Sequence, residues 1–152
     1  TWQDRRMQPE LLRSKADPTV SIDPAEVGRI VEDIFPEALG VWVYGSFADG
    51  HARPDSDLDI GVLAARPLPT QWDLLDRIGE IGSRLGRTID LVDLRRVPPL
   101  LRFEIFSSGL RVAARGPQAC DLYETTSISA YQRLNVERRD LLESIWARGS
   151  VY

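Results

Sequence analysis

The sequence predicts a single domain of the α/β (α+β) class, with a small mixed β-sheet backed by helices and a long C-terminal helix. Three observations predict it. Short apolar segments that alternate like strands are interspersed with longer segments of helical periodicity. A chain of 152 residues is long enough for one hydrophobic core. Its composition, 43% hydrophobic and 28% charged, is that of an ordinary globular domain.

The N-terminal part predicts an arm, a helix and a strand. Residues 1–21 are polar, rich in arginine and without a clear period, so we expect a mobile N-terminal arm. Asp23 is a suitable N-cap with Pro24 at the first helical position, and apolar residues then recur at helical spacing as far as Phe35. The apolar run 41–44 predicts a buried strand that ends at a glycine turn, and residues 47–49 follow it as one helical turn.

The following strand is acidic on one face only. Leu58, Ile60 and Val62 alternate with Asp57 and Asp59, so the strand buries its apolar face and points its acidic face towards a cleft. The remaining pattern predicts, in order, a helix over 70–85, a strand over 88–94, a helix over 98–106, an edge strand over 110–114 and a helix over 119–147. The organisation that follows is an arm over 1–21, a core over 22–115 and a C-terminal helical segment over 116–152.

Two neighbouring segments have the chemistry of a nucleotide site. Side chains two residues apart on a strand share a face, so Asp57 and Asp59 lie roughly 6.5–7 Å apart at their backbones. Paired carboxylates suit Mg²⁺, which prefers oxygen ligands and completes its octahedron with water and substrate phosphates. The upstream Gly45-Ser46 turn offers backbone N–H groups and a hydroxyl to a polyphosphate.

The composition excludes or disfavours most other kinds of catalytic or metal site. Of the 19 cationic residues only Lys15 is a lysine, and no glycine-rich loop precedes it, which excludes a Walker P-loop and disfavours a protein-kinase site. A lone His51 and a lone Cys120 cannot build a zinc site, and we expect Cys120 to be a buried, unreactive thiol. The net charge of −4 argues against direct nucleic-acid binding. No apolar run approaches a membrane span, and the single cysteine agrees with a cytoplasmic location.

The motif has a specific spacing. The Gly45-Ser46 pair stands ten residues ahead of two aspartates separated by one residue, and the whole stretch lies between two apolar strands. This pattern resembles the DNA polymerase β-like nucleotidyltransferase superfamily, in particular the minimal nucleotidyltransferases that include the MntA-like antitoxins. The resemblance covers about residues 23–148 and implies the polymerase β-like nucleotidyltransferase fold.

The resemblance also implies the roles of single residues. It implies two Mg²⁺ ions, ATP as substrate, and a triphosphate contacted by Gly45 and Ser46. It places the third metal carboxylate at the first aspartate of the strand over 88–94, so that the metal-binding and catalytic set is Asp57, Asp59 and Asp90.

Two other aspartates need separate consideration. Asp93 competes with Asp90 for the third position, but its offset of three residues puts it on the opposite face, where we expect a surface charge at the strand end. At Asp49 many family members have an arginine available to the phosphates. The negative charge there disfavours triphosphate unless it points to solvent, and Arg53 is placed to compensate. We expect His51 to be an ordinary loop residue.

Three functions remain open at this point. After the predicted core only one long helix remains, which favours a macromolecular acceptor with its own docking surface. In MntA-like systems the acceptor is a tyrosine of a HEPN-family ribonuclease toxin (HepT), which receives AMP from ATP and is silenced. The resemblance thus implies an antitoxin that is a Mg²⁺-dependent protein adenylyltransferase. The alternatives are an antitoxin that neutralises by binding alone, and a small-molecule nucleotidyltransferase of the aminoglycoside-modifying type.

Overall fold

A four-stranded mixed sheet forms the centre of the protein, whose computed structural model describes residues 12–69 and 71–149. The strand order is β5-β4-β3-β6, with β3 antiparallel to β4 and β6, and β4 parallel to β5. The strand bounds are Ala38–Tyr44 (β3), Leu58–Ala64 (β4), Ile89–Asp93 (β5) and Leu110–Ala114 (β6). The predicted mixed sheet is therefore confirmed.

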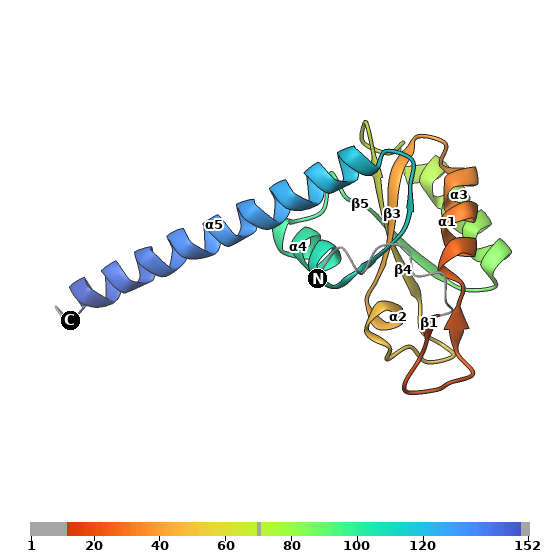
Figure 1. The fold of residues 1–152 in the computed structure, drawn as a ribbon, viewed down its shortest axis with the longest axis horizontal. Coiled ribbons are helices and arrows are strands. Elements are labelled where there is room, and N and C mark those ends of the chain that lie inside the picture. Colours follow the sequence, from red (N-terminus) through yellow and green to blue (C-terminus); the bar gives the residue numbers. More distant parts are fainter. Residues whose placement is uncertain (1–11, 70, 150–152) are drawn as a thin grey trace.

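Helices cover both faces of this sheet (Figure 1). On one face lie α1 (Pro24–Ile34) and α3 (Gln71–Leu85), which enclose the larger core cluster. On the other face lie α4 (Pro99–Ser108) and the beginning of α5 (Pro117–Gly149), around a smaller cluster centred on Trp42. Within the described ranges no helix is both long and apolar enough to cross a membrane.

The start of α1 follows the sequence signal closely. Asp23 is the N-cap, and its carboxylate accepts a hydrogen bond of 3.0 Å from the backbone N–H of Ala25. Pro24 occupies the first helical turn, where its missing N–H costs nothing. Cap and proline together fix where α1 begins against the sheet.

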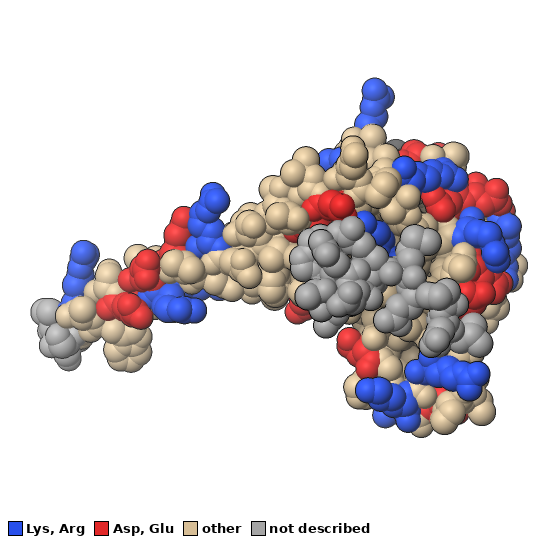
Figure 2. All heavy atoms as spheres, viewed as in Figure 1, with Lys and Arg blue, Asp and Glu red and all other residues tan. Residues whose placement is uncertain are grey.

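Helix α5 packs on the sheet only with its first part and then projects away from the body (Figure 1). Its 33 residues include a projecting segment in which apolar side chains are exposed, among them Leu141 at 59% and Trp146 at 80%. Figure 2 shows acidic and basic side chains along this segment with uncharged surface between them. These exposed apolar side chains thus lack a covering element within the described residues.

The expectation of a mobile arm over 1–21 is wrong for its second half. Leu12–Arg13 (β1) pairs antiparallel with Ser21–Ile22 (β2), which forms a small hairpin. Val20 and Ile22 are buried, because the hairpin packs against the larger core cluster. A pair of two-residue strands carries too little periodicity to be recognised in a sequence. Residues 1–11 lie outside the described part of the chain.

Candidate active site

The turn at Gly45 is shaped around the carboxylate of Asp59. Gly45 lies between β3 and the short helix α2 (Ser46–Asp49) and has φ +70°, a conformation that side chains with a β-carbon rarely adopt. A β-carbon at this position would collide with Oδ2 of Asp59. Glycine is therefore required here both for the turn and for the close approach of an acidic side chain.

Three side chains form a row across the end of the sheet. Tyr44 is the cross-strand partner of Asp59, and Asp59 is the partner of Asp90 in the parallel ladder. Directly opposite residues on adjacent strands project from the same face, about 4.8 Å apart at the backbone. The structure thus brings together two aspartates of the predicted set, Asp59 and Asp90, from two different strands.

Asp57 joins this group from the residue before β4 begins. It is exposed, and its charge acts on Asp59 two residues later. Burial, followed by the charges of Asp90 and Asp57, raises the pKa of the Asp59 carboxyl to about 6. The same surroundings raise the pKa of Tyr44 to about 12, first through burial and then through Asp59 and Asp90. The site therefore concentrates negative charge at one end of the sheet.

Ser46 begins α2, as expected for a residue presented by the Gly45 turn. We call residues 45–52 the Gly-Ser loop. Backbone hydrogen bonds close this loop, from the N–H of Asp49 to Gly45 O (3.0 Å) and from the N–H of His51 to Ser46 O (2.9 Å). Asp49 and His51 are both exposed, so the carboxylate of Asp49 faces solvent.

The donors at this site suit a magnesium ion that is shared with a phosphate ligand. In the described ranges no three acidic, histidine or cysteine side chains converge closely enough to enclose a metal ion by themselves. Mg²⁺ is commonly held by one or two carboxylates, with substrate phosphates and water as the other ligands. The oxygen donors of Asp57, Asp59 and Asp90 fit that requirement, and a cation there would offset their mutual repulsion.

Comparison with known proteins identifies the family. Residues 31–118 match the family model described as "Polymerase beta, Nucleotidyltransferase". The chain belongs to the polymerase β nucleotidyltransferase family. It is a nucleotidyltransferase, and the matched range contains the Gly-Ser loop and all of β3, β4 and β5. The predicted family and the predicted class of enzyme are confirmed.

Two curated members of the family show different extents of similarity. The chain is 30% identical over 121 residues to the protein adenylyltransferase MntA of Shewanella oneidensis, covering 78% of this chain and 84% of that protein. It is 35% identical over 63 residues to spectinomycin 9-adenylyltransferase of Staphylococcus aureus, but this match covers only 24% of that enzyme. Similarity to the first extends over most of that protein, and similarity to the second is confined to one segment.

Solved structures of family members agree with this comparison. A toxin–antitoxin crystal structure with AMP-PNP superposes with a TM-score of 0.69 at 26% identity, covering 82% of this chain and 99% of that one. An MNT antitoxin in complex with a tri-AMPylated Shewanella oneidensis HEPN toxin gives 0.62 at 25% identity, covering 81% and 95%. The predicted fold is the fold of these nucleotidyltransferases.

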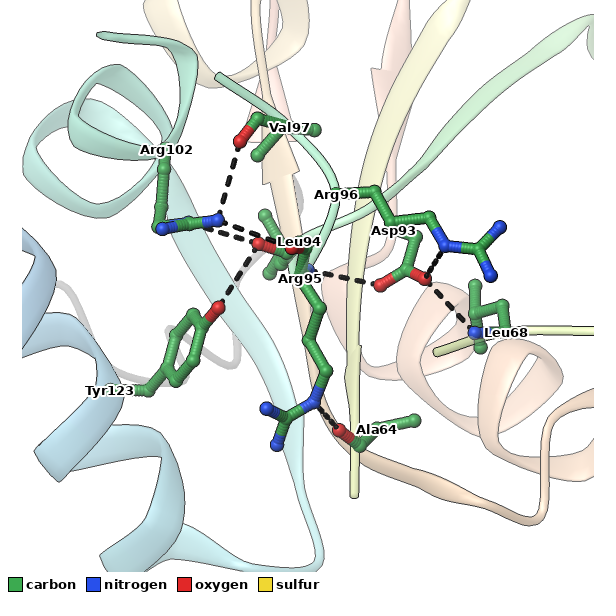
Figure 3. Close-up of polar contacts among 9 residues, drawn as sticks. All are labelled: Ala64, Leu68, Asp93, Leu94, Arg95, Arg96, Val97, Arg102 and Tyr123. Carbon is green, nitrogen blue, oxygen red and sulfur yellow. Dashed lines mark hydrogen bonds and ion pairs between the residues drawn. The ribbon is translucent and has the colours of Figure 1, made fainter. Parts of the chain in front are cut away.

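Asp93 lies apart from the row of Tyr44, Asp59 and Asp90. It pairs with Val62 in the ladder and is only 8% exposed. Its carboxylate accepts hydrogen bonds from the N–H groups of Leu68 (2.9 Å) and Arg95 (3.0 Å), as Figure 3 shows. The expected surface charge is therefore wrong: Asp93 is a buried acceptor that ties the loop after β4 to the loop after β5.

Sequence reasoning overlooked Tyr44 as a member of the site. The signal was available, since Tyr44 directly precedes Gly45 at the end of a strand that pairs with the strand of Asp59. Cys120, in contrast, is as expected. It is buried, its thiol donates to Leu39 O (3.3 Å), and burial raises its pKa to about 11.

The raised pKa of Asp59 predicts a dependence of stability on pH in the absence of divalent metal. The native state binds the proton more tightly than the unfolded chain between pH 3.8 and about 6. The free energy of unfolding should therefore fall as the pH rises through this window and then remain lower. The full shift corresponds to about 3 kcal/mol, which solvent screening at this partly exposed side chain reduces to about 1 kcal/mol.

Asp59→Asn should accordingly raise the free energy of unfolding by about 1 kcal/mol at pH 7.5 and change it little at pH 4. Urea unfolding in EDTA at both pH values measures this difference. Asp55→Asn, at an exposed residue of the turn that precedes β4, is the matched control. An Asp59→Asn variant less stable than wild type at pH 7.5 would contradict the proposed crowding of charge.

Proposed function

We propose that this protein is an antitoxin that acts as a Mg²⁺-dependent protein adenylyltransferase. It transfers AMP from ATP to a tyrosine of a cognate HEPN-family ribonuclease toxin and thereby silences it. The observation that carries the proposal is the row of carboxylates beside the Gly45 turn, in a chain similar to MntA over 84% of that adenylyltransferase. The tri-AMPylated toxin found in complex with a structural neighbour supports the same acceptor class.

Each residue of the site has a part in this reaction. Asp57, Asp59 and Asp90 would hold Mg²⁺, with two ions expected, and these ions would neutralise charge on the triphosphate and on the attacking oxygen. Ser46 and the backbone of Gly45 would contact the phosphates at the turn. Tyr44, on the other side of Asp59, bounds the site towards the aromatic cluster around Trp42.

The transfer itself is a substitution at phosphorus. The hydroxyl oxygen of the acceptor tyrosine forms a bond to the α-phosphorus of ATP, and the bond from that phosphorus to the oxygen bridging to the β-phosphate breaks. Pyrophosphate leaves with the bonding electron pair, and the proton of the acceptor hydroxyl passes to a carboxylate. Asp90, exposed at the edge strand of the row, is the candidate for this base.

Docking of the acceptor is proposed for α5. Its projecting segment presents an apolar stripe that includes Leu134 at 44%, Leu141 at 59% and Ile145 at 53% exposure. An exposed stripe of this length is typical of a surface that binds another protein. This assignment explains why the apolar residues continue well beyond the part of α5 that packs on the sheet.

Neutralisation by binding alone is the competing hypothesis, and it does not explain the row of carboxylates. A surface that only occludes a partner has no use for charges that repel each other. Burial, and then the repulsion from Asp90 and Asp57, raises the pKa of Asp59. The segmental match to a spectinomycin adenylyltransferase supports nucleotidyl transfer as such, but it covers too little of that enzyme to favour a small-molecule acceptor.

The decisive experiment tests whether the toxin stays silenced after this protein has been removed. The chain should be expressed with a HEPN-family ribonuclease encoded beside its gene, and the toxin then separated and weighed intact. We expect a mass gain of whole AMP units and a toxin that stays inactive after this protein is removed. The reaction should stop in EDTA and resume with Mg²⁺, because the proposed ligands are all oxygens.

A variant separates the two hypotheses. Asp57→Ala should neither modify the toxin nor rescue growth, whereas Asp55→Ala should do both. Full rescue by Asp57→Ala with no mass gain on the toxin would establish neutralisation by binding and overturn the proposed activity.

A further inference from the structure

The N-terminal hairpin contacts the Gly-Ser loop through a buried serine. Ser14 directly follows β1 and is 5% exposed. Its hydroxyl oxygen accepts hydrogen bonds from the N–H groups of Ala16 (3.2 Å) and Asp17 (3.4 Å). The same hydroxyl donates its single proton to the carbonyl oxygen of Ala52, at the end of the Gly-Ser loop and 38 residues away in sequence. Ser14 thus joins the turn of the hairpin to the loop.

The next residue adds a second connection. The backbone N–H of Lys15 donates to the carbonyl oxygen of Gly50 with a distance of 2.7 Å. Gly50 has φ +79°, and a β-carbon there would meet the methylene groups of the Lys15 side chain at 3.5–3.7 Å. The lysine stem therefore covers the glycine from the outside, and two successive hairpin residues hold the last three residues of the loop.

These contacts continue to the residue proposed to touch the triphosphate. The N–H of His51, which lies between the two held carbonyls, donates to Ser46 O at 2.9 Å. A shift of the segment 50–52 would therefore displace Ser46 and the Gly45 turn. Ser14, the backbone of His51 and Ser46 form one connected path from the hairpin to the site.

We propose that the hairpin of residues 12–22 is a structural part of the nucleotide site, with Ser14 as the positioning residue that holds the Gly-Ser loop in its binding conformation. The inference rests on the proposed function, in which this loop binds the phosphates of ATP. A loop that is already ordered loses less conformational entropy when it binds a ligand. Loss of the Ser14 hydroxyl should therefore weaken nucleotide binding, while the carboxylates remain in place.

The test compares single variants of the full chain by calorimetric titration with MgATP. Ser14→Ala and Ser14→Cys remove the strong donor and should weaken binding about three- to tenfold, the range expected for one lost hydrogen bond. Ser14→Thr keeps a hydroxyl and should restore binding to within about twofold. Thr19→Ala is the matched control, because it removes a hydrogen bond to Asp17 in the same hairpin without touching the loop.

Hydrogen exchange supplies a readout that simple destabilisation would not reproduce. In Ser14→Ala the amide of His51 should exchange at least about fivefold faster than in wild type, while Thr19→Ala should leave it unchanged. Equal MgATP affinity in wild type, Ser14→Ala and Ser14→Cys would overturn the proposal, as would equal losses in Ser14→Ala and Thr19→Ala. A wild-type chain that binds MgATP but modifies no toxin would contradict the proposed function. The comparison of MgATP affinities among the Ser14 and Thr19 variants would still test the role of Ser14.

Discussion

Alanine at Asp57 or Asp59 should abolish nucleotide transfer and leave the fold intact. Each carboxylate is proposed to hold Mg²⁺ against the triphosphate, and its removal should lower the rate at least about a hundredfold, the size of loss seen when one preorganised charge-stabilising group is deleted. Neither substitution opens a cavity in the core, because both side chains lie on the polar face of β4 or just before it. Removal of Asp59 also takes away a partly buried charge that repels Asp90 and Asp57.

The measurement is the rate of AMP incorporation into the separated toxin, together with thermal unfolding of each variant. Asp55→Ala, in the exposed turn two residues before Asp57, should retain the wild-type rate. If either Asp57→Ala or Asp59→Ala, at least as stable as wild type, keeps more than a few per cent of the activity, the assignment of that carboxylate fails.

The parts of the site that were predictable depend on local periodicity. Alternation along one strand places Asp57 and Asp59 together without any knowledge of tertiary structure. The pairing of Asp59 with Asp90 depends on the register of two parallel strands. A helix between two strands favours a parallel pair, but a single sequence does not determine which residues face each other in it. Asp90 was therefore found through the resemblance, and the register supports its placement in the row.

The parts that were missed depend on contacts between distant segments. Ser14 bonds to Ala52 and Trp42 to Glu124, pairs separated by 38 and 82 positions. No periodicity relates such residues, so a polar serine in an arginine-rich segment was interpreted as part of a mobile arm. Asp93 was misjudged for a related reason, since its partner Leu68 belongs to a loop and loops carry no pattern that reveals what they bury.

The attachment of α5 to the sheet depends on a buried ion pair. Arg111 on β6 and Glu124 on α5 are 4% and 3% exposed, and their side chains are 2.9 Å apart. Glu124 also accepts a hydrogen bond of 2.8 Å from the indole N–H of Trp42. Burial alone would lower the pKa of Arg111, but the carboxylates of Asp121 and Glu124 raise it above the usual value.

Glu124→Ala should therefore lower the free energy of unfolding by about 3 kcal/mol. Among the described residues it leaves the buried guanidinium of Arg111 with the peripheral carboxylate of Asp121 alone, and it deprives Trp42 of its acceptor. Asp33→Ala is the matched control, since its ion pair with Arg84 is exposed and should contribute less than about 1 kcal/mol. Urea unfolding followed by tryptophan fluorescence measures both variants.

An apolar replacement of the whole pair tests the physical reason for this loss. Within the described residues Nε of Arg111 and Oε2 of Glu124 are buried without a hydrogen-bond partner, so the ion pair is incompletely satisfied. The double variant Arg111→Met, Glu124→Leu should regain part of the stability lost in Glu124→Ala, because no buried charge remains uncompensated and the missing acceptor of Trp42 is the only common loss. A double variant as unstable as Glu124→Ala would show that α5 is held by the specific geometry of the ion pair rather than by burial of its apolar surface.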